Sequence, residues 1–106
     1  MSKEPKILRV VRMTFRADAV ADFVARFPTI QPRVQAATGC EAVVLLQDAD
    51  NPCVVSKLSI WASVADLNAY RASALFGEVW PQTKSGFAAP PRAESYFWDP
   101  SLGFPS

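Results

Sequence analysis

The chain has 106 residues, half of them hydrophobic, with 11 Lys and Arg against 10 Asp and Glu and no His. This length predicts a single domain with a modest core, and the near-zero net charge without a basic run argues against nucleic acid as a partner. No apolar run reaches the roughly 18 residues of a membrane span, and the polar start MSKEPK is unlike a signal peptide, so we expect a cytoplasmic protein that does not contact membranes. The missing imidazole removes the usual general base and argues against ordinary hydrolase chemistry.

The first third of the chain predicts a strand followed by a helix. Residues 7–15 (ILRVVRMTF) are rich in β-branched and apolar side chains, which favours a strand. From Ala17 the apolar residues repeat at helical spacing, and they form one stripe: Val20, Phe23, Val24, Phe27, Ile30 and Val34. Pro28 and Pro32 each remove an internal hydrogen bond, so we expect a kink or a short second segment before Gly39 ends the helix.

Residues 40–47 and 53–61 predict two further strands, joined by the turn sequence DADNP. Cys40 and Cys53 begin these strands and would lie on the order of 23 Å apart along the hairpin. A disulfide needs its α-carbons within about 7 Å, so both cysteines are predicted to be reduced. Two separated thiols in a chain without histidine also predict no metal site.

The remaining residues predict a second helix and a last strand. Ser63 and Asp66 match a capping box, so a helix begins there, runs to about Ala74 and continues past Phe76 toward Pro81 or the Ser85-Gly86 region. Residues 93–98 (AESYFW) predict a strand, and residues 99–106 an irregular tail. No repeat or linker is present, so we expect one domain over residues 1–106 with its core at about 7–98.

The element order predicts an α+β, ferredoxin-like βαββαβ fold, in which two helices cover one face of a four-stranded antiparallel sheet. A sheet covered on one face should alternate apolar and polar residues. Here residues 43–46 (VVLL) are all apolar, and Val10 and Val11 also place apolar groups on both faces. Because no other segment remains to cover the second face, we expect a homodimer whose two sheets enclose an apolar interior.

Aromatic residues gather on the second predicted helix. Tyr70, Phe76 and Trp80 fall roughly within one sector of it, because residues three, four or seven apart share a face. Two interpretations remain open. The stripe is either part of the core or the wall of a pocket for a flat, apolar ligand.

Several of these residues resemble the antibiotic biosynthesis monooxygenase domain over about residues 7–98. The similarity rests on Gly39-Cys40, on Trp61, and on Tyr70, Ser73, Phe76 and Trp80 of the second helix. It implies a dimeric α+β barrel and a family that includes oxygenases of quinols and polycyclic phenols that use no metal or flavin, haem-degrading enzymes, and members without assigned activity. In the haem-degrading branch, Trp80 would stand at the iron-binding His, Tyr70 at a Trp and Val11 at an Asn. Indole nitrogen only donates, so haem degradation is disfavoured.

The oxygenase interpretation demands less of the side chains, because an electron-rich phenolate passes an electron to O₂ itself once the protein encloses and orients it. The resemblance thus predicts a cofactor-independent monooxygenase that oxidises a small phenolic or quinol-like aromatic; the alternative is a non-enzymatic dimeric α+β barrel that binds a ligand or serves in a stress response. Tyr70 and Trp80 are the candidate catalytic residues. The predicted substrate-binding residues are Val11, Met13, Phe23, Phe27, Trp61, Tyr70, Phe76 and Trp80, with Arg12 or Lys84 as a cation for a phenolate. Four of these residues also have a structural alternative. Phe23 and Phe27 could simply pack the helix against the sheet, Trp61 could fill space in the core, and Arg12 could point to solvent.

Overall fold

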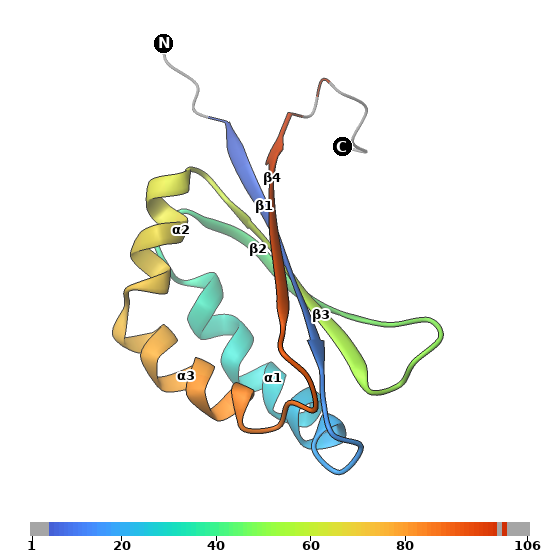
Figure 1. Cartoon of the computed structure of the whole chain (residues 1–106). Helices are drawn as coiled ribbons and strands as arrows, with labels where there is room; N and C mark the ends of the chain where they lie inside the picture. Colours follow the sequence, from blue (N-terminus) through green and yellow to red (C-terminus); the bar gives the residue numbers. More distant parts are fainter. Residues whose placement is uncertain (1–4, 100, 102–106) are drawn as a thin grey trace.

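A computed structural model describes residues 5–99 and 101 of the chain, so most of the predicted tail at 99–106 lies outside the described residues. In that part of the chain, four strands and three helices follow one another (Figure 1). They are β1 (Lys6–Thr14), α1 (Val20–Gln35), β2 (Cys40–Gln47), β3 (Val54–Trp61), α2 (Val64–Arg71), α3 (Ala74–Lys84) and β4 (Arg92–Trp98). None of these helices is long and apolar enough to cross a membrane.

The strands form one antiparallel sheet in the order β2-β3-β1-β4, and the helices lie on one of its faces (Figure 1). β1 is central and pairs with both β3 and β4; Ile7, for example, lies opposite Trp61 on one side and Phe97 on the other. This arrangement confirms the predicted α+β, ferredoxin-like fold. Its consequence for the site is that alternate residues of β1 and β3 point toward the helices.

α1 is a single helix of 16 residues, so of the two expected outcomes, a kink or a short second segment, the second segment is wrong. Pro28 and Pro32 both lie on its exposed side, where water can satisfy the carbonyl groups that the two prolines leave without a donor. The opposite side of the helix buries Phe23, Phe27 and Val34 against the sheet. Packing of this apolar stripe therefore outweighs the two missing hydrogen bonds.

The second predicted helix is in fact two helices, and Ser73 separates them. Its hydroxyl donates to the Tyr70 carbonyl at 2.6 Å and accepts from the Phe76 backbone N–H at 3.2 Å, so one side chain closes α2 and caps α3. Ser63 caps α2 as predicted, accepting from the Asp66 backbone N–H at 3.1 Å. The break changes the direction of the chain between Tyr70 and Phe76.

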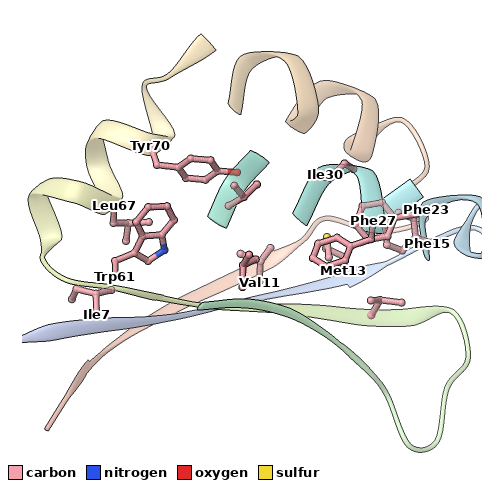
Figure 2. Packing of buried hydrophobic residues seen from close by; sticks show 13 residues of the cluster. Ile7, Val11, Met13, Phe15, Phe23, Phe27, Ile30, Trp61, Leu67 and Tyr70 are labelled. Atoms are coloured by element: carbon pink, nitrogen blue, oxygen red, sulfur yellow. The ribbon is translucent and has the colours of Figure 1, made fainter. Parts of the chain in front are cut away.

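Buried apolar side chains fill the layer between the sheet and the helices (Figure 2). Trp61, at the end of β3, is 1% exposed and donates its indole N–H to Ser59 Oγ at 3.0 Å. Cys40 and Cys53 are both free thiols, which confirms that prediction. The sheet and its helices thus form one core on one side.

The other face of the sheet is uncovered in a single chain and carries many apolar side chains, together with Arg12, Ser56 and Glu94. Val44 and Leu46 of β2 are 43% and 46% exposed, and Tyr96 of β4 is 51% exposed. Between them lie half-buried side chains of the two central strands, which are Leu8, Val10, Leu58 and Ile60. We call this set, from Val44 to Tyr96, the outer sheet face.

Gly39, between α1 and β2, is expected to tolerate no side chain. Its φ of +80° is a left-handed conformation, and an added Cβ would lie 2.1 Å from Asp66 Oδ2 and 2.6 Å from Asp66 Cβ. We expect Gly39→Ala to lower the free energy of unfolding by about 2 kcal/mol, measured by urea denaturation. Gly77→Ala is the matched control, because nothing lies within 4 Å of its added Cβ in α3, and it should stabilise by about 0.5–1 kcal/mol.

Candidate functional site

A partly open cavity of about 120 Å³ lies between the sheet and the helices α2 and α3. Its lining combines strand residues with aromatic and cationic side chains: Arg9, Val11, Lys57, Ser59, Leu67, Tyr70, Arg71, Phe76, Trp80, Pro91 and Ala93. An engineered protein cavity of about 150 Å³ binds benzene, so the space here is of the order of one aromatic ring.

Three aromatic rings form one wall of this cavity. Phe76 meets the Tyr70 ring edge-on, with centroids 5.4 Å apart at 81°, and stacks on Trp80 at 5.7 Å and 17°. The Tyr70 ring in turn stacks on Trp61, behind the wall, at 5.0 Å. Figure 2 shows Tyr70 extending from α2 into the layer above the sheet. Such contacts hold the rings in defined positions and present an apolar, π-rich surface.

Lys57 of β3 brings an amine into this aromatic surrounding. Its Nζ lies 5.6 Å from the centroid of the Tyr70 ring, within the range of a cation–π contact. The pKa of Lys57 is lowered from 10.5 to about 8, mainly by burial and also by the nearby charge of Arg9, while the Cys40 thiol acts in the opposite direction. Lys57 can therefore exchange a proton near neutral pH.

The pKa of Tyr70 is shifted in the opposite direction from that of Lys57. Burial raises the pKa of its hydroxyl to about 12, because the phenolate form would lose its hydration. Tyr70 therefore stays protonated at neutral pH and can donate a hydrogen bond to a ligand oxygen.

Arg9 and Arg71 add two further positive charges. Arg9 of β1 donates from Nη1 to Ser95 Oγ at 2.9 Å, and burial together with the charge of Arg71 lowers its pKa. Within residues 5–99 and 101, no carboxylate pairs with Arg9, Lys57 or Arg71. The cavity thus carries an excess of positive charge.

A second, smaller hollow of about 20 Å³ lies deeper in the layer between the sheet and the helices. Apolar side chains dominate its lining, including Met13, Phe23, Phe27, Ile30 and Val79. Lys57, Tyr70, Phe76 and Trp80 border both hollows. These four side chains therefore stand at the inner end of the larger cavity.

The structure brings most of the predicted binding residues to these two spaces. Val11, Tyr70, Phe76 and Trp80 line the cavity, and Met13, Phe23 and Phe27 line the deeper hollow. Trp61 lines neither of them.

The two predicted cations lie elsewhere. Arg12 belongs to the alternate set of β1 residues, on the outer sheet face, where its Nη1 lies 3.3 Å from Asp48 Oδ1. Lys84 is exposed at the end of α3 and borders neither hollow. The cations of the cavity are Arg9, Lys57 and Arg71 instead, and a period of two could have found the first, because Arg9 lies between Ile7 and Val11 on one face of β1.

No match was found among curated proteins. Solved structures with the same fold include a conserved protein from Methanosarcina mazei Go1, with a TM-score of 0.84, 18% identity, and coverage of 92% of this chain and 96% of that one. They also include a candidate antibiotic biosynthesis monooxygenase from Nitrosomonas europaea, with a TM-score of 0.83, 15% identity and coverage of 92% and 94%. A third, a candidate monooxygenase of the same kind from Bordetella bronchiseptica, has a TM-score of 0.80, 24% identity and coverage of 91% and 99%.

At these identities the solved structures establish the fold alone, and the sequence itself carries the assignment further. The family model described as antibiotic biosynthesis monooxygenase matches residues 6–80, which include β1, β3 and the aromatic residues of α2 and α3. The chain belongs to the antibiotic biosynthesis monooxygenase family.

Proposed function

We propose that this protein is a monooxygenase that oxidises a small phenolic or quinol-like aromatic with O₂, using no metal or flavin. Membership of the family and a ring-sized cavity with aromatic walls support this function. The observation that carries it is Lys57, an amine with a lowered pKa in contact with the Tyr70 ring.

The reaction balances without an outside reductant. A quinol that reacts with O₂ to give a hydroxyquinone and water loses four electrons, and these reduce both oxygen atoms. One atom enters the ring and the other leaves as water. The protein must therefore favour the electron-rich, deprotonated form of the substrate and exclude side reactions.

Lys57 and Tyr70 take the two roles that this step requires. The neutral amine of Lys57 accepts the phenol proton, and the resulting ammonium group stabilises the phenolate. Tyr70, which stays protonated, donates a hydrogen bond to a substrate oxygen and fixes its orientation. Phe76 and Trp80 hold the flat ring against the sheet.

The protein acts as a cytoplasmic homodimer in this proposal. The outer sheet face exposes Val44, Leu46 and Tyr96, and a second copy of the same face would bury them. Two free thiols agree with a reducing compartment.

Oxygen uptake by metal-stripped protein, offered a panel of quinols and hydroxyanthrones, tests the enzyme. We expect Tyr70→Phe to lower kcat/KM about 10-fold, because one hydrogen bond to the reacting oxygen is lost, and Trp80→Phe to lower it similarly through a poorer fit. Tyr96→Phe, on the outer sheet face, is the matched control and should leave the rate unchanged. Ligand binding without oxygen consumption would refute the enzyme and leave the ligand-binding alternative.

A further inference from the structure

We infer that the substrate is a single-ring aromatic that carries a carboxylate in addition to its hydroxyl groups, and that Arg9 and Arg71 bind this carboxylate. The inference deepens the proposed function and rests on it for the redox chemistry. Its own basis is the charge, the depth and the size of the cavity.

The charge of the cavity exceeds what a phenolate can neutralise. Three cationic side chains line it, and no Asp or Glu is among its lining residues in the described part of the chain. A phenolate supplies one negative charge, which Lys57 matches. The guanidinium groups of Arg9 and Arg71 remain, and their planar arrays of N–H donors suit a carboxylate, which can accept two parallel hydrogen bonds.

The cations also lie at different depths. Lys57 borders the apolar inner hollow, whereas Arg9 and Arg71 line only the outer cavity. Arg71 and Ala93 are exposed, which places the arginine end at the mouth of the cavity near β4. A bound ring would direct its hydroxyl inward to Lys57 and Tyr70 and its carboxylate outward, where partial hydration lowers the cost of burying a charge.

The size of the cavity sets the number of rings. A volume of about 120 Å³ is close to that of a cavity that binds benzene, so one ring fits with its carboxylate at the open end, and a polycyclic phenol would have to extend past Arg71 into solvent. A dihydroxybenzoate combines one ring, two hydroxyl groups that make it an oxidisable quinol, and a carboxylate at its edge.

Two ligands of similar size and shape, 2,5-dihydroxybenzoate and its neutral amide 2,5-dihydroxybenzamide, show how much the carboxylate charge contributes to binding. Calorimetric titration at pH 7 without oxygen is expected to show at least 30-fold tighter binding of the acid. Arg71→Gln should reduce this preference to less than 5-fold, and Arg9→Gln should act in the same direction. Arg33→Gln is the control, because Arg33 pairs with Glu78 and does not line this cavity, and it should keep the full preference.

Equal affinities for acid and amide would overturn the inference, and so would a preference that survives both Arg71→Gln and Arg9→Gln. In either case oxidation of the amide would still support the proposed function. Tight, arginine-dependent binding of the acid without oxygen uptake would support the inference and refute the function. Failure to bind either ligand would overturn the inference, while oxygen uptake with other quinols of the panel would still support the proposed function.

Discussion

Replacing Lys57 with methionine is expected to lower kcat/KM for oxygen uptake at least 100-fold while it makes the fold more stable. Methionine has a similar length and no charge, so it preserves packing against the Tyr70 ring but neither accepts the phenol proton nor stabilises a phenolate. General base catalysis contributes about 100-fold to 10,000-fold to a rate. Oxygen-electrode rates, corrected for spontaneous quinol oxidation, measure the loss.

The same substitution removes a buried charge. A pKa of about 8 in the folded chain, against 10.5 for the free side chain, corresponds to about 3 kcal/mol of unfavourable free energy below pH 8. Between pH 8 and 10.5 the unfolded chain binds this proton more tightly than the folded chain, so the contribution of Lys57 to stability rises with pH. We expect Lys57→Met to raise the free energy of unfolding by about 1–3 kcal/mol at pH 7 and to abolish this rise.

The pH dependence of the rate follows from the same titration. The neutral amine becomes the major form above about pH 8, so kcat/KM should rise with pH through that value and reach a plateau. Lys57→Met should flatten the profile. Lys84→Met, an exposed lysine outside the cavity, is the control for both rate and stability. A wild-type profile that does not change between pH 6 and 9 would contradict a base at Lys57.

The strands of the sheet were predictable from the sequence. Which residues of each strand face the helices was only partly predictable. β-Branched and apolar residues identify β1, β2 and β3, but consecutive apolar residues, as at 43–46, give no alternation from which to read orientation. In β3, Lys57 lies between Ser56 and Leu58, and nothing local says that Lys57 faces the helices. The structure fixes it through pairing with Val11, whose side chain is in the core.

The position of each arginine along β1 decides on which face of the sheet its side chain lies. Arg9 and Arg12 have similar local surroundings in the sequence, yet an odd separation along a strand places them on opposite faces. Arg12, one of the two cations predicted beside the aromatic wall, therefore lies on the outer sheet face, and Arg9 lines the cavity instead. Arg71 follows Tyr70 directly at the end of α2, and both line the cavity together with Phe76 and Trp80 of α3.

Val44→Lys is expected to weaken dimerisation at least 1,000-fold, so that the variant is monomeric at about 10 µM in sedimentation equilibrium while the wild type is a dimer. Val44 lies opposite Leu58, which in turn lies opposite Val10, so the three side chains form one row across the middle of the outer sheet face. In the dimer an ammonium group at this position would be buried beside apolar side chains, at a cost of several kcal/mol. The single chain should still fold, because β2 is an edge strand and Val44 is exposed in the monomer.

Val64→Lys supplies the matched control for that experiment. Val64 is 44% exposed against 43% for Val44, but it lies on α2, on the opposite side of the sheet. The control should therefore remain a dimer, and both variants should keep the circular dichroism of the folded chain. A wild type that sediments as a monomer, or a Val44→Lys variant that stays dimeric, would contradict the assignment of the outer sheet face to a second copy. Because the cavity lies between the sheet and the helices, a folded monomer should still bind a ligand, which separates assembly from the chemistry of the site.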